Sequence, residues 1–329
     1  MNKIVCPFCF EQSAFGGSCP HCGEKLPKDL NGSELMFSIV GSTESGKSHY
    51  IATLIAQLYS QAHRFHWSCR ALNDETMNLY DSRFRKRLYE DRVVIDQTQS
   101  ANVGAHRPLI YALNFDSGLP PVTLVFYDAA GERFNAEEEM ARTTRYLNES
   151  SGVIFLVDPL QLPYVREKFV ASGQGGESEL PTSAAPGARV SNIFQRLVNV
   201  LRRKENDVRQ KARTPVALTL SKVDALRFLL TDESPLFFPS FHRRHGCFCR
   251  SDAARIDEYL RSFLMAVDRD RELLNHMKLL DNCRCFGVSA LGQNPKSAGQ
   301  RLRFPPRPLR VLDPFLWLLQ QHGLIPEVE

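Results

Sequence analysis

The chain has 329 residues, of which 43% are hydrophobic and 24% charged, the composition of a globular protein with a real core. Its formal net charge of +4 is too small to indicate nucleic acid or an anionic membrane surface as a partner. No apolar run reaches the length of a membrane span, and the first residues lead into a cysteine pair without the apolar region of a signal peptide. We therefore expect a cytoplasmic protein whose nine cysteines bind metal or lie in the core.

Two CxxC pairs stand at the start of the chain. They comprise Cys6, Cys9, Cys19 and Cys22. Each pair can place two thiolates on one knuckle, and two knuckles supply the four sulfurs of a tetrahedral Zn²⁺ site. A module of about thirty residues has too little core to fold without metal. We expect a structural or adaptor-like zinc ribbon over residues 1–30, with unrelated reduced cysteines as the alternative.

A glycine-rich loop lies between the apolar run 35–40 and an apolar helix expected over 47–62. It reads Gly41-Ser42-Thr43-Glu44-Ser45-Gly46-Lys47-Ser48, the pattern GxxxxGK[ST]. The glycines let backbone N–H groups face phosphates, and the helix, which also carries His49, presents its positive end to the same anion. Lys47 is expected to bridge the β- and γ-phosphates and Ser48 to ligate Mg²⁺. The loop predicts binding of a nucleoside triphosphate with Mg²⁺.

Strand-like and helix-like segments alternate from this loop to the C-terminus. This order predicts the three-layer α/β sandwich of a P-loop NTPase, a mostly parallel sheet with helices on both faces. We expect strands at 35–40, 109–115, 122–127, 152–157, 215–220 and 283–289. We expect helices at 47–62, 73–91, 135–149, 190–210, 252–275 and 313–322. The domain is expected to span 34–329, with insertions near 63–108, 171–189 and 231–250.

A carboxylate follows the strand expected over 122–127. Asp128 at this position can hold Mg²⁺, usually through water. It opens the sequence Asp128-Ala129-Ala130-Gly131-Glu132, in which the Gly131 N–H can contact the γ-phosphate and register its loss. The alternative is that Asp128 only caps its strand.

The base-selecting residues come after the strand expected over 215–220. They read Ser221-Lys222-Val223-Asp224. The Asp224 carboxylate can accept hydrogen bonds from guanine N1–H and N2–H₂, whereas adenine lacks this donor pair and would leave the carboxylate unsatisfied. The Lys222 stem can lie across the nucleotide. A backbone N–H can meet guanine O6 from the segment Ser289-Ala290-Leu291. In this order, the motifs favour GTP.

The ordered set GSTESGKS, DAAGE, SKVD and SAL resembles the Ras-like GTPases of the TRAFAC clade. It resembles most closely the bacterial double-GTPase type of conflict and signalling systems, over residues 34 to 322. Val157-Asp158-Pro159 and Val311-Leu312-Asp313-Pro314 also look like that group. The resemblance implies a G domain whose loops change shape with the γ-phosphate, and a partner protein that reads this change.

Three positions bear on how closely the resemblance holds. Ser221 stands where Asn or Thr is usual, which can soften affinity without changing the base. Glu132 stands where Ras-like enzymes carry the Gln that orients water, so it can act as a base or repel the γ-phosphate. Thr98 is our choice for the switch threonine that contacts Mg²⁺ and the γ-phosphate, with an ordinary loop threonine as the alternative.

Three functions stay open at this point. The leading hypothesis is a slowly hydrolysing GTP switch, with Lys47, Glu132 and Thr98 as catalytic residues, that regulates a partner protein in a bacterial conflict or signalling system. The second is a GTP-dependent scaffold with negligible hydrolysis, and the third a P-loop ATPase or kinase with an accidental SKVD match. Dimerisation is left open. Two histidines and two thiols of the third insertion fit no common metal spacing and are expected in a surface loop; they are His242, His245, Cys247 and Cys249.

Overall fold

A seven-stranded sheet of order β10-β8-β7-β3-β6-β5-β4 forms the centre of the computed structural model. The structure describes residues 3–14, 16–30, 34–42, 44–95, 107–119, 121–126, 144–173, 189–205, 210–269, 271–295 and 299–329. The strands are β3 (Glu34–Gly41), β4 (Trp67–Ala71), β5 (Leu109–Phe115), β6 (Val122–Phe126), β7 (Gly152–Val157), β8 (Val216–Leu220) and β10 (Cys283–Gly287). The strands from β10 to β6 run parallel, and β5 and β4 are antiparallel to their neighbours. The predicted mostly parallel sheet is confirmed.

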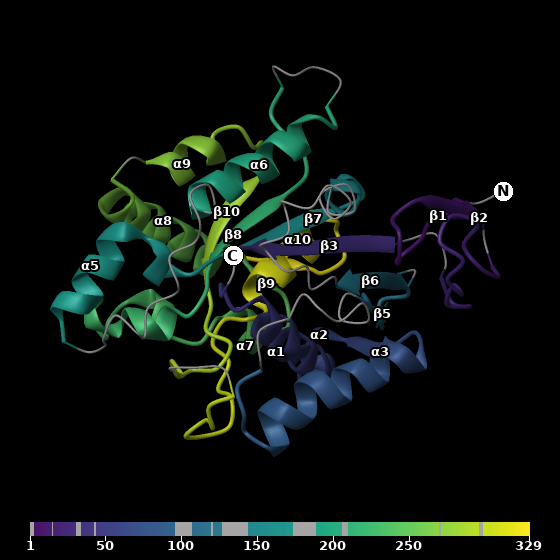
Figure 1. Ribbon diagram of the computed structural model, residues 1–329, viewed down its shortest axis with the longest axis horizontal. Coiled ribbons are helices and arrows are strands. Elements are labelled where there is room, and N and C mark those ends of the chain that lie inside the picture. Colours follow the sequence, from purple (N-terminus) through teal and green to yellow (C-terminus); the bar gives the residue numbers. More distant parts are fainter. Residues whose placement is uncertain are drawn as a thin grey trace.

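Helices cover both faces of this sheet (Figure 1). Ile154 and Leu156 of β7 belong to the apolar core on the side of α1 and α10, whereas Val153, Phe155 and Val157 belong to the core on the side of α6 and α8. This two-residue alternation is how a buried strand serves two helical layers. The helices are α1 (Lys47–Ser60), α2 (Ala62–Phe65), α3 (Asp74–Leu79), the π-helical η1 (Tyr80–Glu90), α5 (Pro163–Ala171), α6 (Val190–Arg202), α7 (His242–His245), α8 (Arg250–Val267), α9 (Glu272–Met277) and α10 (Asp313–Gln321). Within the described ranges, no helix is long and apolar enough to cross a membrane.

The largest differences from the sequence-based expectations concern three elements. The edge strand β4 was not predicted, because among its residues only Trp67 is buried and the apolar alternation is too weak to read. The helix α5 was also not predicted. The single helix expected over 252–275 is two helices, α8 and α9. The first ends just before Asp268, and the Asp268 carboxylate accepts the Leu273 N–H of the second at 3.0 Å. Of the helix expected over 135–149, residues 144–148 are described and are helical.

The N-terminal module shares a core with the main domain. Its hairpin of β1 (Lys3–Val5) and β2 (Gln12–Ala14) stands beside β3 (Figure 1). Phe8 and Phe10 are buried in one cluster with residues of the sheet and of helix 144–148; these are Met36, Ile110, Val125 and Tyr146. The Phe10 and Tyr146 rings lie 4.9 Å apart between centroids. The module is therefore docked against the sheet by apolar contacts.

A buried ion network fixes the third expected insertion to the core. The Arg310 guanidinium, fully buried, lies 2.5 Å from an oxygen of Asp252 and 2.9 Å from one of Asp313. His242 lies in the same cluster, and its Nδ1 accepts the Cys249 N–H at 2.8 Å. Burial lowers the pKa of His242, so the ring is neutral there.

The prediction that two histidines and two cysteines of this insertion lie in a surface loop is therefore wrong for three of the four residues. His242, Cys247 and Cys249 are buried, and only His245 is exposed. In the described part of the chain these four residues do not gather as one ligand set. Sequence spacing gave no sign that the network would bind this segment, in which the Phe238 carbonyl accepts from Arg310 at 3.1 Å and the Phe241 N–H donates to Asp252 at 3.2 Å.

Replacement of Arg310 by leucine is expected to lower the free energy of unfolding by about 3–5 kcal/mol, because it leaves two carboxylates buried without their cation. Denaturant unfolding followed by circular dichroism measures the change. Arg269→Leu is the matched control, since Arg269 pairs with Glu167 at 3.3 Å on the surface and should matter little. Equal small losses in both variants would contradict a stabilising role for the buried network.

Candidate functional site

Three of the four predicted nucleotide motifs lie within the described residues, and they gather at one edge of the sheet. The strands β3, β7, β8 and β10 are parallel neighbours, so the segments after their carboxyl ends lie at the same edge. In open α/β sheets this edge is where ligands bind. The glycine-rich loop follows β3, the SKVD segment follows β8 and the SAL segment follows β10.

Two glycines of the loop stand where another residue would either clash or be strained. A Cβ on Gly41 would lie 2.5 Å from the Leu156 carbonyl oxygen, because β3 ends close against β7 at this point. Gly46 has φ +84° and immediately precedes α1, a conformation that glycine adopts without strain. Ser45 between them is fully buried. The loop thus turns tightly from strand to helix, as phosphate-binding loops do.

Lys47 points back over the loop that precedes it. Its ammonium donates hydrogen bonds to the carbonyls of Gly41 at 3.1 Å and Ser42 at 2.8 Å. Only 8% of the residue is exposed. The positive charge is therefore held beside the backbone of the loop.

The predicted base motif, residues 221–224, lies beside the glycine-rich loop, residues 41–48, which we call the phosphate loop. Ser221 donates both its backbone N–H and its hydroxyl to the Val157 carbonyl, at 2.9 and 3.2 Å, which ties the motif to the end of β7. Lys222 has φ +50°, and a Cβ placed on Gly46 would lie 3.8 Å from its Cε. The Lys222 stem therefore runs alongside the phosphate loop.

Asp224 is held between the base motif and the SAL segment. Burial raises the pKa of its carboxyl, and a hydrogen bond from the Ser289 side chain acts in the opposite direction. The Ser289 oxygen also accepts the Gly292 N–H at 2.9 Å, and the Val223 N–H donates to the Val288 carbonyl at 3.1 Å. The last two motifs are thus brought together around one carboxylate. Ala290 and Leu291 continue from Ser289, and the latter is buried.

The remaining predicted residues fall into two groups. Ser48 and His49 lie in the first turn of α1, and the His49 Nε2 accepts the Ile95 N–H at 3.2 Å, so that side chain faces the 92–95 segment. Glu44 lies in the loop with φ +62°. The others lie outside the described residues; they are Thr43, Thr98, Asp128, Gly131 and Glu132.

A turn after β7 adds two residues that the motifs did not include. The Asp158 carboxylate accepts the Leu160 N–H at 2.9 Å, the turn-capping role favoured by the neighbouring proline, and also pairs with the Lys222 ammonium at 2.7 Å. Gln161 accepts a hydrogen bond from the Ser42 hydroxyl. Nothing in the sequence around Gln161 indicates this contact.

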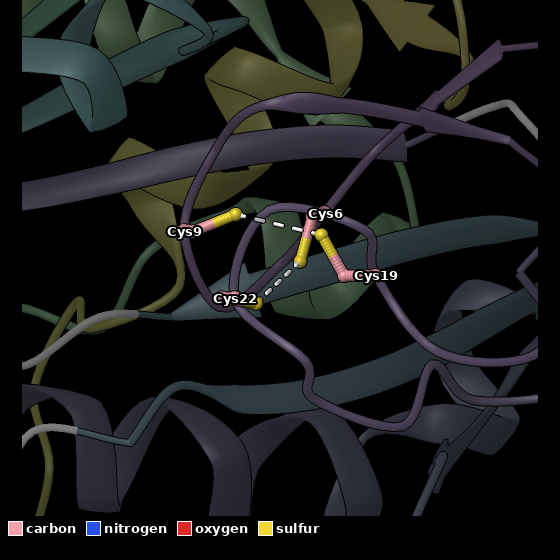
Figure 2. Close-up of side chains that lie close together, drawn as sticks. All are labelled: Cys6, Cys9, Cys19 and Cys22. Atoms are coloured by element: carbon pink, nitrogen blue, oxygen red, sulfur yellow. Dashed lines mark hydrogen bonds between the residues drawn. The ribbon is translucent and has the colours of Figure 1, made fainter.

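The four N-terminal cysteines form a compact cluster (Figure 2). The sulfurs of Cys6 and Cys22 lie 3.8 Å apart, and those of Cys9 and Cys19 lie 3.7 Å apart. A tetrahedral Zn²⁺ with sulfurs at about 2.3 Å separates them by about 3.8 Å. The donor set and its dimensions therefore fit zinc.

The two knuckles have the same backbone design. Phe10 and Gly23, each following the second cysteine of its pair, have φ +64° and +76° and donate their N–H groups to the carbonyls of Cys6 and Cys19, both at 2.9 Å. Burial acts to raise the pKa of Cys19, but backbone N–H groups of the second knuckle outweigh it and lower that pKa to about 6. Backbone donors thus favour the thiolate that a metal requires. In the first knuckle burial outweighs them, raising the pKa of Cys6 and raising that of Cys9 to about 11.

The chain is 27% identical over 326 residues to a protein of Mycolicibacterium smegmatis described as "Putative ESX-1 scaffolding and assembly protein SaeC", covering 93% of this chain and 80% of the relative.

Two solved structures resemble it weakly. The Arl6 BBS3 small GTPase of Trypanosoma brucei is 15% identical, with 89% of this chain and 99% of that chain covered and a TM-score of 0.31. The Ski7 GTPase-like domain of S. cerevisiae is also 15% identical, with 90% and 51% covered and a TM-score of 0.38. At this level neither structure bears on the chemistry of the site.

The family comparison covers most of the chain. Residues 35–265 match the family model described as Double-GTPase 2, a span that contains the phosphate loop and the SKVD segment. The chain therefore belongs to the Double-GTPase 2 family.

Proposed function

We propose that this chain is a GTP-dependent switch that hydrolyses GTP slowly and changes its contact with a partner protein as it does so. Membership in a double-GTPase family supports GTP binding. The observation that carries the choice of guanine is the arrangement of Asp224, which stands at the same sheet edge as Lys47 and accepts a hydrogen bond from Ser289. A carboxylate fixed between two loops is suited to accept the paired donors of guanine.

The residues have distinct proposed roles. Lys47 and the loop backbone bind the β- and γ-phosphates, and Ser48 ligates Mg²⁺ together with Asp128 and Thr98. Gly131 contacts the γ-phosphate and Glu132 acts on the attacking water. Asp224 selects guanine, Lys222 covers the nucleotide, and the SAL segment meets guanine O6. The domains are residues 1–30, a structural zinc ribbon, and 34–329, the G domain.

A scaffold with negligible hydrolysis is the second proposed function. It is favoured by the description of the Mycolicibacterium smegmatis relative as a scaffolding and assembly protein. Both functions include a partner protein, and they differ in whether bound GTP turns over.

Substitution of Asp224 by asparagine is the test of the guanine assignment. We expect the affinity for GTP to fall about 100-fold, because a charged acceptor of two hydrogen bonds is lost. Affinity for XTP should rise, since the asparagine amide can donate to the 2-oxo group of xanthine. Equilibrium titration with fluorescent GTP, XTP and ATP analogues measures these changes.

Asp232→Asn is the matched control for this substitution. Asp232 is 93% exposed, pairs with Arg227 at 2.9 Å and lies just beyond the motif, so its variant should keep the preference for GTP. An unchanged preference for GTP over ATP in Asp224→Asn would show that Asp224 does not select guanine, and a wild-type preference for ATP would favour an ATPase.

A further inference from the structure

A turn after β7 connects the phosphate loop to the base motif. It comprises Asp158 and the 3₁₀ turn η2 (Pro159–Gln161). Asp158 at its start is fully buried, and Gln161 at its end reaches the loop after β3. Neither residue belongs to a motif proposed to contact nucleotide, so the proposed function does not account for their contacts.

Asp158 determines where the Lys222 side chain lies. One carboxylate oxygen is 2.7 Å from the Lys222 ammonium, and the other accepts the Leu160 N–H at 2.9 Å. Charge-assisted hydrogen bonds of a buried carboxylate are strong and directional. A free lysine side chain samples many rotamers, and this contact selects the one in which the stem passes alongside Gly46.

Gln161 contacts the phosphate loop. Its side-chain oxygen accepts a hydrogen bond from the Ser42 hydroxyl, and the Ser42 carbonyl accepts one from the Lys47 ammonium at 2.8 Å. Ser42 is 2% exposed, so this contact is shielded from water. The turn therefore contacts the phosphate loop next to the Lys47 ammonium and contacts the base motif through Lys222.

We propose that Asp158 and Gln161 are positioning residues, which hold Lys222 and the phosphate loop in the arrangement that receives the nucleotide. This rests on the proposed role of Lys222 in covering the nucleotide. Because the side chains are ordered before binding, less conformational entropy is lost when the nucleotide arrives. Lys222 and the phosphate loop contact parts of the nucleotide that GTP and XTP share. Asp158 therefore affects the affinity for both nucleotides, and Asp224 selects the base.

Asp158→Asn is the variant that tests this role, because asparagine keeps the shape and can still accept the Leu160 N–H. We expect GDP to dissociate roughly tenfold faster, the value of one charge-assisted hydrogen bond. The ratio of affinities for GTP and XTP should stay as in wild type. Stopped-flow displacement of a fluorescent GDP analogue from the full chain measures the dissociation rate.

A double-mutant cycle with Lys222→Met separates positioning from general stability. If Asp158 acts through Lys222, the double variant releases GDP no faster than Lys222→Met alone. Multiplicative rate increases in the double variant would overturn the proposal.

Asp257→Asn is the matched control. Its carboxylate has the same kinds of partner, Arg261 at 2.9 Å and the Cys285 N–H at 2.7 Å, but it lies on α8 beside the outer strand β10. This variant should lose a similar amount of stability and release GDP at the wild-type rate. Equal release from both variants would assign the effect of Asp158 to stability and overturn the proposal.

Gln161→Ala keeps the proposal testable if Asp158→Asn does not fold, because Gln161 is partly exposed. Roughly threefold faster GDP release is expected, in line with loss of one neutral hydrogen bond. Wild-type release in this variant would overturn the proposal. If the wild-type chain itself does not bind GTP or GDP, the proposed function fails; if it binds and Asp158→Asn releases GDP normally, only the positioning role fails.

Discussion

Replacement of Lys47 by alanine is expected to weaken GTP binding at least about 100-fold and to remove single-turnover hydrolysis, because the side-chain cation proposed to bind the β- and γ-phosphates is lost. The structure places this ammonium within 3.1 Å of two loop carbonyls, so alanine removes a charge whose position is already fixed. Binding is measured by titration with a fluorescent GTP analogue, and hydrolysis with radiolabelled GTP and enzyme in excess.

Lys204→Ala is the control for that experiment. The Lys204 ammonium also contacts two backbone carbonyls, those of Leu147 at 3.5 Å and Ser150 at 3.3 Å, but it follows the end of α6. This variant should bind and hydrolyse GTP as wild type does. If GTP decays at the same rate with wild type and Lys47→Ala, the catalytic role of Lys47 fails and the scaffold becomes the better description.

Removal of zinc should unfold residues 1–30 and also loosen the adjacent part of the G domain. Structural zinc contributes on the order of 10 kcal/mol to folding in small modules, more than this hairpin can replace. Unfolding of residues 1–30 also removes contacts from the G domain, because Phe10 packs on Tyr146. The Tyr146 hydroxyl in turn donates to the Phe37 carbonyl of β3 at 3.0 Å. We expect amide hydrogen exchange to accelerate in residues 1–30 and 144–148 after treatment with a zinc chelator in excess Mg²⁺.

A pair of cysteine variants controls for side effects of the chelator. Cys9→Ser removes one sulfur of the cluster and should reproduce the faster exchange. Cys69→Ser changes a cysteine of similar burial on β4, outside the cluster, and should not. Unchanged exchange in residues 1–30 upon chelation would show that the module does not depend on metal.

This result bears on what the ribbon does for nucleotide binding. A ribbon that folds separately would leave GTP affinity intact when zinc is removed. The docked arrangement predicts instead that affinity falls, because helix 144–148 follows the DAAGE segment along the chain and carries part of the shared core. The ion pair of Arg145 with Glu11, at 3.6 Å, adds a polar contact at the same place.

The sequence by itself determined the features that depend on short spacing. Two CxxC pairs predicted the sulfur cluster, GxxxxGK[ST] predicted the loop between β3 and α1, and alternating apolar segments predicted a mostly parallel sheet. These patterns are readable because their chemistry is local: a tight turn, a knuckle or a buried strand needs particular residues at fixed offsets.

Tertiary structure decided which distant residues meet. Asp158 pairs with Lys222 across 64 positions, and Gln161 meets Ser42 across 119. His242 is buried beside Asp252 and Asp313, against the expectation of a surface loop, and Phe10 docks the ribbon on Tyr146. The contacts of Asp158 and Gln161 follow from strand order and from the register of β3, β7 and β8, which bring separate loops to one edge. Strand order is set by packing of the whole sheet and leaves no periodic trace in any one segment, so no local pattern could specify them.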